Sequence, residues 1–401
     1  MEQKYRALLL ENIDEEAKRN LETKGFEVVM HKDSMGEDDL IKNIKNVHIL
    51  GIRSKTKITK NVLEHAKELL CIGCYCIGTN NVELDVAQNK GIPVFNSPYA
   101  NSRSVAENII AQIINLARQF GDRNMEMHKG IWNKKSKGCY EIRGKILGII
   151  GYGNIGKQLS VLAESMGMKV IFYDILNVMP LGNSKRMGSL EGVLESSDFV
   201  TLHVPETDIT KNMIKKRELQ MMKKGSYLLN ASRGSVVNID DLVEYIKIGH
   251  IAGSYIDVFP EEPLSNTNKW KTELQNISNV IMTPHIGGST EEAQEAIARD
   301  VSDKIIKYIK TGCTMYCVNF PETELVYGGP TTHRVLNIHY NKRGVLKEIN
   351  NILSVYNVES QILKTSGSVG YLIADVDAGT SEEIKDKIDK LTYTIKTRIL
   401  Y

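Results

Sequence analysis

Three residues with the chemistry of a proton-transfer site, Arg233, Glu262 and His285, each follow closely on an apolar run typical of a β-strand. Histidine has an unperturbed pKa near ~6.5, so it can accept or donate a proton at neutral pH. A neighbouring carboxylate would fix its tautomer and raise its pKa, and a guanidinium holds a carboxylate through charge-assisted hydrogen bonds. Together these groups suit the oxidation of a secondary alcohol, in which a base removes the hydroxyl proton as hydride leaves carbon.

The strand-like runs place these residues at one edge of a predicted parallel sheet. The runs are, in chain order, Phe199–Val204, Ser226–Asn230, Ile251–Asp257 and Val280–Met282. Parallel strands share a direction, so the polar residues after their carboxyl ends should converge at the edge where open sheets bind ligands. A lone histidine after a strand is more often structural than catalytic. An arginine and a glutamate at matching strand ends favour the catalytic interpretation.

A glycine-rich turn with the sequence G-Y-G-N-I-G, residues 151–156, lies between the apolar run Ile146–Ile150 and a helix-like stretch. Gly151 permits the tight turn, Gly153 lets backbone approach a pyrophosphate, and Gly156 lets the helix pack closely on the strand. The N-terminus of that helix would present free N–H groups to an anion. The alternative is that the glycines serve only as turn formers.

An acidic residue, Asp174, ends the next apolar run, Lys169–Tyr173, and stands 23 residues after Gly151. A carboxylate at this position can accept hydrogen bonds from a ribose diol. It would also repel a 2′-phosphate. The sequence therefore predicts a binding site for NAD rather than NADP.

The composition is that of an ordinary globular protein with two or three domains: 401 residues, 42% hydrophobic and 25% charged. A formal net charge of +2 argues against a general nucleic-acid-binding role, since such proteins usually carry a clear basic excess. No apolar run approaches the ~18 residues that a membrane span needs, and the N-terminus resembles a first strand rather than a signal peptide. We therefore expect a cytoplasmic protein without nucleic-acid or membrane partners.

The six cysteines do not indicate a disulfide scaffold, which belongs to short secreted chains. Cys71, Cys74 and Cys76 are close together, but no second His/Cys group at workable spacing completes a tetrahedral set. The stretch also fits a buried strand in which cysteine acts as a small hydrophobe. We therefore expect no metal site.

The first part of the chain shows an α/β pattern. Its predicted elements are the strands Tyr5–Leu10, Phe26–Met30, Asn46–Ile52 and Gly91–Phe95 and the helix Asp14–Lys24. A long amphipathic helix is predicted from Ser104 to about Phe120, with Ser104 and Glu107 at capping-box spacing, so we expect a domain boundary near residue 101. A second long helix, from Glu291 to about Lys310, would return the chain to the first domain.

The last segment shows a new pattern after a linker predicted at Tyr327–Pro330. The predicted elements have the order βαββαβ of a ferredoxin-like module: Arg334–Tyr340, Val345–Val355, Val358–Lys364, Tyr371–Asp377, Ser381–Leu391 and Tyr393–Tyr401. The predicted fold class is α/β, with two doubly wound parallel-sheet (Rossmann-like) domains plus this C-terminal domain. A substrate-binding domain would comprise 1–100 and 289–327, an NAD-binding domain 101–288, and the C-terminal domain 330–401.

Several motifs resemble the D-isomer-specific 2-hydroxyacid dehydrogenase family: NASRGS around Arg233, DVFPEEP around Glu262, TPHIGGST around His285, and GIIGYGNIG. The motifs GIRSKT, CYCIGTNNVELD, FNSPYANSRSVAE, HKGIWNK and VNFPE extend the resemblance over nearly the whole chain, to the branch that ends in one regulatory ACT domain. For that branch the resemblance implies oxidation of 3-phosphoglycerate with NAD to 3-phosphohydroxypyruvate, the first step of L-serine synthesis. Certain relatives also reduce 2-oxoglutarate to 2-hydroxyglutarate.

The resemblance also implies site residues, position by position. Arg233, Glu262 and His285 are the expected catalytic residues. The expected NAD contacts are Gly151, Gly153, Asn154, Ile155, Gly156, Asp174, Ala231, Ser232, Arg233, Asp257, His285, Ile286, Gly287 and Gly288. The expected substrate contacts are Arg53, Ser54, Lys55, Asn101, Trp132 and Lys134, of which the last two would reach the site of a neighbouring subunit. A substrate with both carboxylate and phosphate requires several cations, and this set contains them.

The C-terminal segment is similar to ACT domains that bind free L-serine between two copies. His339, Asn341 and Asn357 match the effector-binding positions, and the resemblance implies a serine-regulated homotetramer. The alternative is an ACT module that only dimerises. Two further alternatives concern the whole chain: a dehydrogenase of lactate or glyoxylate, and a non-catalytic NAD-sensing protein similar to the corepressors built on this fold, which lack an ACT tail.

Overall fold

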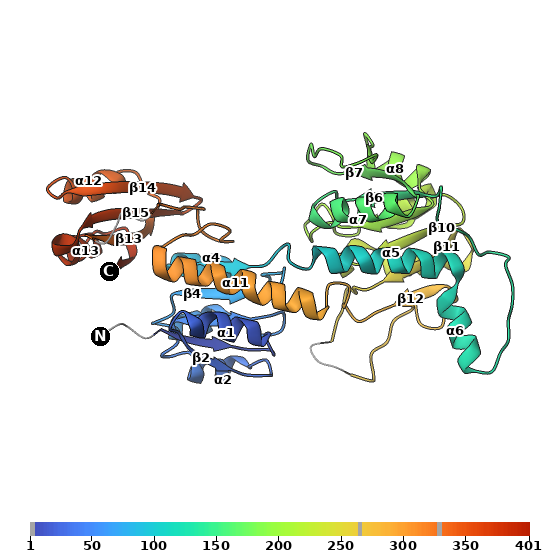
Figure 1. Cartoon of the computed structure of the whole chain (residues 1–401), viewed down its shortest axis with the longest axis horizontal. Coiled ribbons are helices and arrows are strands. Elements are labelled where there is room, and N and C mark those ends of the chain that lie inside the picture. The colour runs from blue at the N-terminus through green and yellow to red at the C-terminus, as the bar shows by residue number, and fades with distance from the viewer. Residues whose placement is uncertain (1–4, 264–266, 327–330) are drawn as a thin grey trace. The chain divides into compact units, whose positions relative to one another are not determined.

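The structure, a computed structural model, describes residues 5–263, 267–326 and 331–401, so the linker predicted at Tyr327–Pro330 lies outside the described residues. The chain forms two compact units (Figure 1). One unit comprises Met1–Ala100 and Gln294–Tyr401, and the other comprises Asn101–Ala293. The described strands form three sheets, two parallel and one antiparallel.

The unit formed by Asn101–Ala293 is built on a seven-stranded parallel sheet with the order β12-β11-β10-β9-β6-β7-β8. Its strands are β6 (Ile146–Ile150), β7 (Lys169–Tyr173), β8 (Lys185–Arg186), β9 (Phe199–Leu202), β10 (Ser226–Asn230), β11 (Ile251–Ile256) and β12 (Val280–Met282). The chain order reverses between β6 and β9, and in doubly wound sheets ligands bind outside the carboxyl ends of the strands at such a point.

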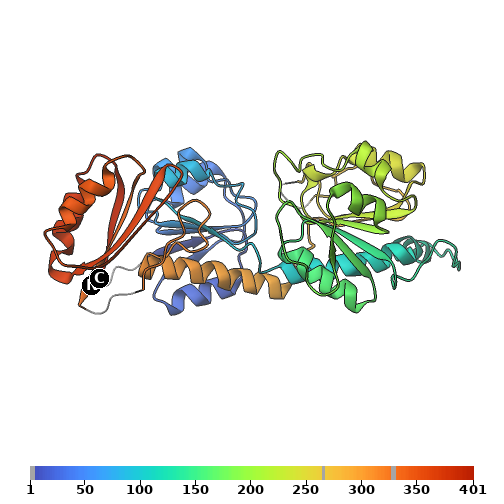
Figure 2. The same cartoon turned by 90° about the horizontal axis from the view of Figure 1, so that it is seen from above.

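Helices cover both faces of this sheet (Figure 2). On one face α5 and α7 pack against each other and against the sheet, and α8, α9 and α10 cover the other face. The helices are α5 (Ser102–Arg118), α6 (Phe120–His128), α7 (Asn154–Ser165), α8 (Leu190–Ser196), α9 (Lys216–Met221) and α10 (Ile239–Lys247), with a short 3₁₀ turn, η1, at Gly234–Val236. Strand β10 is buried throughout, as expected of a central parallel strand covered on both faces.

The other unit contains a five-stranded parallel sheet with the order β2-β1-β3-β4-β5. Its strands are β1 (Arg6–Leu9), β2 (Glu27–Met30), β3 (Ile49–Ile52), β4 (Cys71–Cys74) and β5 (Val94–Asn96). Helices α1 (Glu15–Thr23) and α11 (Glu291–Thr311) cover one face. Helices α2 (Glu37–Asn43), α3 (Lys60–His65) and α4 (Leu84–Asn89) cover the other, so the predicted doubly wound arrangement is confirmed here too.

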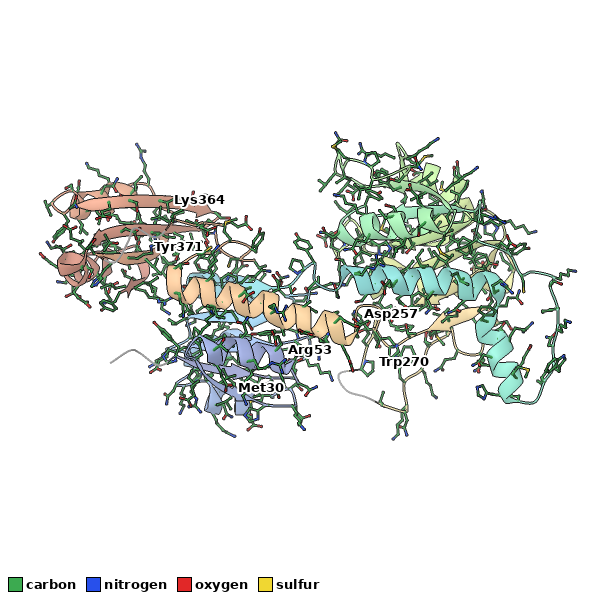
Figure 3. The ribbon with its side chains drawn as sticks, viewed as in Figure 1. Met30, Arg53, Asp257, Trp270, Lys364 and Tyr371 are labelled. Carbon is green, nitrogen blue, oxygen red and sulfur yellow. The ribbon has the colours of Figure 1, made fainter. Side chains whose placement is uncertain are left out.

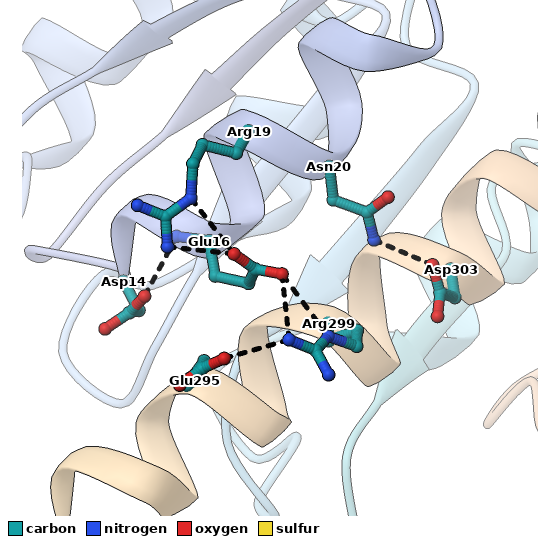
Figure 4. A network of polar contacts seen from close by, with 7 residues as sticks. All are labelled: Asp14, Glu16, Arg19, Asn20, Glu295, Arg299 and Asp303. Carbon is teal, nitrogen blue, oxygen red and sulfur yellow. Dashed lines mark hydrogen bonds and ion pairs between the residues drawn. The ribbon is translucent and has the colours of Figure 1, made fainter.

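Charged side chains join α1 to α11 on the surface of this unit (Figure 4). Glu16 accepts hydrogen bonds from both Arg19 and Arg299, with the closest contacts at 2.9 and 3.1 Å. Asn20 donates to Asp303 over 2.7 Å. The network therefore holds α11 beside the first helix of the chain, although the two helices are far apart in sequence.

The C-terminal segment forms an antiparallel sheet with the order β14-β15-β13-β16, and its βαββαβ pattern is confirmed. The elements are β13 (Thr332–Tyr340), α12 (Val345–Leu353), β14 (Val358–Ser366), β15 (Val369–Asp377), the 3₁₀ turn η2 (Ala378–Thr380), α13 (Ser381–Asp389) and β16 (Thr394–Leu400). Helices α12 and α13 cover one face. The other face, which includes Tyr371, packs into the core around α11 and the five-stranded sheet. Lys364 on β14 donates to the carbonyl of Glu322. Figure 3 labels both Tyr371 and Lys364.

Two details around the helix α5 differ from the prediction. The helix begins at Ser102 with Asn101 as its N-cap, so the predicted capping box of Ser104 and Glu107 is wrong. Ser104 instead bonds to Thr290, over 3.0 Å, and Glu107 pairs with Arg103. The helix ends where Gln119 adopts a left-handed conformation with φ of 55°, and the chain continues as α6, which the sequence did not indicate.

Within the described ranges, none of the helices combines the length and the apolar composition needed to cross a bilayer.

Candidate active site

The glycine turn after β6 has the close packing that its spacing predicts. Gly151 has a φ of 90°, and a Cβ atom there would lie 2.2 Å from the carbonyl oxygen of His203. A Cβ atom on Gly156 would lie 2.5 Å from the carbonyl oxygen of Gly151. A Cβ atom on Gly153, by contrast, would meet no other atom within 4 Å, so the space beside this glycine is open. The first and third glycines thus allow β6, the turn and α7 to approach closely, and the second leaves room for a ligand.

The N-terminus of α7 is suited to an anion. Its N-cap is Gly153, no side chain caps the first N–H groups, and no acidic residue lies in the first turn. Uncapped N–H groups at a helix N-terminus bind phosphates through hydrogen bonds and the helix dipole. The open space at Gly153 and these free donors fit the pyrophosphate of a dinucleotide.

Asp174 is held at the end of β7 by the same turn. Its carboxylate accepts hydrogen bonds from the backbone N–H of Tyr152, over 2.7 Å, and from that of Leu176, over 2.8 Å. The two bonds fix the position of the carboxylate beside the glycine turn. A fixed, partly exposed carboxylate beside the glycine turn fits a ribose diol.

His285 and Glu262 form a hydrogen-bonded pair. The Nδ1 atom of His285 lies 2.8 Å from Oε2 of Glu262, and Oε1 of Glu262 accepts the N–H of Phe259 over 3.0 Å. The Nε2 atom of His285 makes no hydrogen bond within the part of the chain that the structure describes, and the side chain is 51% exposed. One ring nitrogen is therefore anchored and the other faces outward, as proton transfer to a bound molecule requires.

Each partner shifts the pKa of the other. The hydrogen bond to Glu262 raises the pKa of His285 above its ordinary value and outweighs burial, which acts in the opposite direction. Burial acts to raise the pKa of Glu262, but the bonds from His285 and from the Phe259 N–H outweigh it and leave that pKa below its ordinary value. The positive charge of Arg233 lowers the pKa of both groups, which places it in their electrostatic neighbourhood.

Asp257, which Figure 3 labels, organises the turn that carries His285. It is 1% exposed, and its Oδ1 accepts the hydroxyl of Thr283 and, over 2.9 Å, the N–H of Ile286. Its Oδ2 accepts the N–H of Gly287 over 2.8 Å. The turn needs this support because His285 has a φ of 55°, which is uncommon for a residue other than glycine. Sequence reasoning assigned Asp257 only to the cofactor and missed this task.

The segment after β10 is shaped by Asn230. Its Oδ1 accepts both the N–H and the hydroxyl of Ser232, over 3.0 and 2.8 Å, and its Nδ2 donates to the carbonyl of Arg233 over 3.0 Å. Arg233 in turn donates from Nη1 to the carbonyl of Ser232 over 2.7 Å. Asn230, fully buried at the strand end, is a second positioning residue that sequence reasoning missed.

The structure brings Asn101 and Ala231 to the turn of His285–Gly288. A Cβ atom on Gly288 would lie 2.3 Å from Nδ2 of Asn101. A Cβ atom on Gly287 would lie 3.6 Å from Cβ of Ala231. The loops after β10 and β12 and the start of α5 therefore meet at one place, as the strand directions predict.

The predicted substrate residues Arg53, Ser54 and Lys55 follow β3 in the unit that holds the five-stranded sheet. Their loop is held by Glu11, whose carboxylate accepts the N–H of Lys55 over 2.9 Å and that of Thr56 over 2.7 Å. Glu11 is 7% exposed and has a φ of 64°. Glu11 follows β1, and an acidic residue directly after a strand can indicate a carboxylate that holds a neighbouring loop. Sequence reasoning overlooked this signal.

Trp132 and Lys134 are exposed in the segment after α6, with 81% of Trp132 accessible. Among the described contacts, neither meets another predicted site residue. Several apolar side chains of the same region are also exposed: Phe120, Met125, Met127, Ile131 and Tyr140. Helix α6 buries none of its residues within this chain.

The three predicted effector residues lie at different places in the C-terminal sheet. His339 is 3% exposed and bonds to Asn337, and Asn341 at the same end of β13 donates to the carbonyl of Gly367. Asn357 donates to Asp377, which pairs with the opposite end of β13. The length of this nine-residue strand, about 27 Å, separates the two ends. One copy of the chain therefore does not bring these three side chains together.

The cysteine cluster shows the features of a packed strand. Cys71 and Cys74 lie in β4, and burial raises the pKa of Cys71 to about 12 and that of Cys74 well above its ordinary value. Cys76 donates its S–H to the carbonyls of Arg53 and Gly78. Among the residues that the structure describes, no group of three or more His, Cys, Asp or Glu side chains could hold a metal ion.

Comparison with known proteins gives consistent results along the whole chain. Residues 110–287 match the D-isomer specific 2-hydroxyacid dehydrogenase, NAD binding domain, and residues 336–396 match the AHAS small subunit-like ACT domain. D-3-phosphoglycerate dehydrogenase of Dictyostelium discoideum is 57% identical over 398 residues, which cover 99% of this chain and 98% of that protein. The enzyme of the same name from Escherichia coli K12 is 45% identical over 404 aligned positions, covering 99% of this chain and 98% of that protein.

Among solved structures, D-lactate dehydrogenase from Aquifex aeolicus, complexed with NAD and lactic acid, is 26% identical with a TM-score of 0.67. The match covers 79% of this chain and 100% of that chain. The glycine turn, Asp174 and the pair of Glu262 and His285 all lie within the residues that match the NAD-binding domain.

Proposed function

We propose a reaction for this chain from the premise that it belongs to the D-isomer-specific 2-hydroxyacid dehydrogenase family, among the D-3-phosphoglycerate dehydrogenases. The resemblance seen in its motifs is thereby confirmed, and the chain is an NAD-dependent dehydrogenase with an ACT domain. The reaction that we infer is the oxidation of 3-phosphoglycerate to 3-phosphohydroxypyruvate, the first step of L-serine synthesis.

The observation that carries the proposal is the bond between Nδ1 of His285 and Oε2 of Glu262, 2.8 Å long, within the NAD-binding domain. In the proposed reaction His285 accepts the hydroxyl proton of the substrate at Nε2 while Nδ1 stays bonded to Glu262. The alcohol carbon loses a hydride as the oxygen loses this proton, so the C–O bond becomes a carbonyl. NAD supplies the hydride acceptor when bound.

The remaining residues hold the reactants in this proposal. Arg233 binds the substrate carboxylate and polarises the reacting oxygen through charge-assisted hydrogen bonds. Arg53, Lys55 and Lys134 supply positive charge for the phosphate, and Ser54, Asn101 and Trp132 complete the substrate contacts. We assign the NAD contacts to the turn at 151–156, Asp174, Ala231, Ser232, Arg233, Asp257 and the turn His285–Gly288.

The test is the formation of NADH, followed by absorbance, with 3-phosphoglycerate, lactate or glycerate as substrate. We expect turnover only with the phosphorylated acid, at a KM of ~1 μM to 1 mM. Turnover with lactate instead would identify a different 2-hydroxyacid dehydrogenase. NADH binding without turnover on any of the three would favour an NAD-sensing protein.

We also propose that 2-oxoglutarate is reduced as a side reaction, because its second carboxylate can take the place of the phosphate beside the same cations. Oxidation of NADH on addition of 2-oxoglutarate tests this. The absence of NADH oxidation in an enzyme that is active on 3-phosphohydroxypyruvate would rule it out.

We propose a homotetramer in which the exposed apolar residues of α6 and the segment after it contact a second copy and bring Trp132 and Lys134 to its site. L-serine would bind between two ACT domains, because a second copy can bring its Asn357 beside His339 and Asn341 of the first. Sedimentation analysis and titration of activity with serine test the two parts. A monomer, or activity unaffected by serine, would contradict the corresponding part.

The domain division that we propose is a substrate-binding domain at 1–100 and 289–327, an NAD-binding domain at 101–288 and an ACT domain at 330–401. A cytoplasmic location, too, stays a prediction from composition. Fractionation of cells that produce the chain tests it.

A further inference from the structure

Arg186, an exposed residue of the edge strand β8, contacts the segment that follows Asp174. Its Nη1 atom donates to Oδ1 of Asn177 over 2.7 Å, and its Nη2 atom donates to the main-chain oxygens of Asp174 and Leu176 over 3.4 and 3.2 Å. In the described ranges no carboxylate forms an ion pair with this guanidinium. The positive charge of Arg186 therefore lies against the backbone of Asp174, the residue that we assign to the ribose, without a carboxylate paired to it.

The strand register explains why Arg186, and not its neighbour, reaches this place. Strand β8 pairs in parallel with β7, with Arg186 opposite Phe172 and Lys185 opposite Ile171. Successive side chains of a strand point to opposite faces of the sheet. Lys185 thus carries the same charge on the same short strand but on the other face, which makes it a matched control.

The two charged groups near the ribose position would act on a 2′-phosphate in opposite ways. The carboxylate of Asp174 is fixed by the N–H groups of Tyr152 and Leu176, so it remains where it repels a phosphate. A guanidinium is suited to phosphate because its planar fork can donate two hydrogen bonds at once. Since the Arg186 side chain is exposed and bound mainly to neutral oxygens, it can exchange these partners for a phosphate.

We propose that Arg186 is a latent ligand for the 2′-phosphate of NADP, and that Asp174 alone prevents its use. The cofactor preference of this chain is then set by one carboxylate, with a phosphate-binding cation already in place. This inference rests on the proposed function, because it requires the adenosine ribose to lie at Asp174.

The test measures binding rather than turnover. Full-length protein is titrated by calorimetry with ADP and with 2′,5′-ADP, and NADH and NADPH binding are followed by nicotinamide fluorescence. Asp174→Ala is expected to bind 2′,5′-ADP at least tenfold more tightly than the unchanged chain. Adding Arg186→Gln to Asp174→Ala should lower the 2′,5′-ADP affinity about tenfold, which corresponds to ~1.4 kcal/mol.

Two further variants separate charge from structure. In the Asp174→Ala background, Arg186→Lys should keep part of the gain in 2′,5′-ADP affinity, because it keeps the charge but loses the two-pronged hydrogen bonding of the guanidinium. In the same background, Lys185→Gln should keep the whole gain in 2′,5′-ADP affinity, because the Lys185 side chain lies on the other face of the sheet. ADP affinity should differ little among these double variants, which shows that the site has not collapsed.

Equal 2′,5′-ADP affinity of Asp174→Ala with and without Arg186→Gln would overturn the inference. An equal loss with Lys185→Gln would also overturn it, since the effect would then be one of general charge. If the unchanged chain binds neither NADH nor ADP, the proposed function fails instead, so the two failures are distinguishable.

Discussion

His285 combines two features that leave one ring nitrogen available for chemistry. Its backbone is in the left-handed region, with a φ of 55°, and Asp257 holds the following two N–H groups. Glu262 then anchors Nδ1 and raises the pKa of the imidazole. The backbone sets where the ring lies, and the carboxylate sets its tautomer and its basicity.

Replacing His285 by Ala removes the proposed proton acceptor and should lower kcat by ~10² to 10⁴-fold, the usual contribution of general acid–base catalysis. The variant should still bind NADH, as fluorescence measures, because the glycine turn and Asp174 are untouched. Steady-state kinetics with 3-phosphoglycerate give kcat. A variant with unchanged turnover would remove His285 from the mechanism.

The pKa of His285 predicts the pH dependence of both reaction directions. Alcohol oxidation needs the neutral imidazole, so kcat/KM should rise as pH rises through a pKa above the ordinary value for histidine. The reverse reaction, reduction, needs the protonated imidazole, so its kcat/KM should fall as pH rises over the same range. Glu262→Gln removes the group that raises this pKa, so the pH profiles of both reaction directions should move to lower pH.

The pH profile of kcat/KM for Glu262→Gln tests this shift. Glu261→Gln is the control, because Glu261 is exposed and it is Glu262, not Glu261, that bonds to His285. A profile that stays in place in Glu262→Gln would mean that the carboxylate positions His285 without tuning it.

At the scale of elements, the cofactor site depends on how closely α7 approaches the end of β6. The approach is possible because Gly156 has no Cβ atom, which would otherwise lie 2.5 Å from the carbonyl oxygen of Gly151. The obstacle is backbone rather than a movable side chain, so the helix itself would have to shift. The free N–H groups of the α7 N-terminus would shift with it.

Gly156→Ala should therefore weaken NADH binding about tenfold or more and destabilise the unit by ~1–3 kcal/mol, the usual cost of overpacking. Gly188→Ala is the control, because its added Cβ would meet nothing within 4 Å. Fluorescence titration and denaturant unfolding give the two quantities. Equal NADH affinity in the two variants would show that the close approach at Gly156 is not needed.

At the scale of the whole molecule, a buried arginine connects the ACT sheet to the rest of its unit. Arg334 is 1% exposed, and its guanidinium bonds both carboxylate oxygens of Asp375, over 2.6 and 2.8 Å. It also donates to the carbonyls of Thr311, Leu325 and Val326, at and beyond the end of α11. One side chain thus joins two strands of the ACT sheet to the helix that precedes them.

Asp375→Ala leaves this guanidinium buried without its counter-charge and should destabilise the ACT sheet by ~3–5 kcal/mol. Native-state hydrogen exchange of β13 and β15 measures the loss locally, without assuming that the whole chain unfolds in one step. Glu383→Ala, which breaks an exposed pair with Lys387, is the control and should leave that exchange unchanged. Unchanged protection in Asp375→Ala would mean that apolar contacts alone hold the sheet.

Local pattern was sufficient for the order and type of the main elements and for the glycine turn. The predicted bounds of β7, β10 and β12 agree with the structure to the residue, because each is an apolar run bounded by charged, polar or turn-forming residues. The fold class followed from the alternation of such runs with helical periods, and the family followed from motifs that lie within a few residues of each strand end.

Contacts between residues far apart in sequence were decided only by the tertiary structure. Helix α5 begins at Ser102 and Ser104 bonds to Thr290, while Glu11 holds a loop that follows β3. Packing brings these partners together although they are far apart in sequence. Likewise, the distance between Asn341 and Asn357 depends on the pairing of β13 with β15. The periodicity of apolar residues predicts which face of a helix or strand is buried. It does not predict which residue, distant in sequence, contacts the end of that helix or strand.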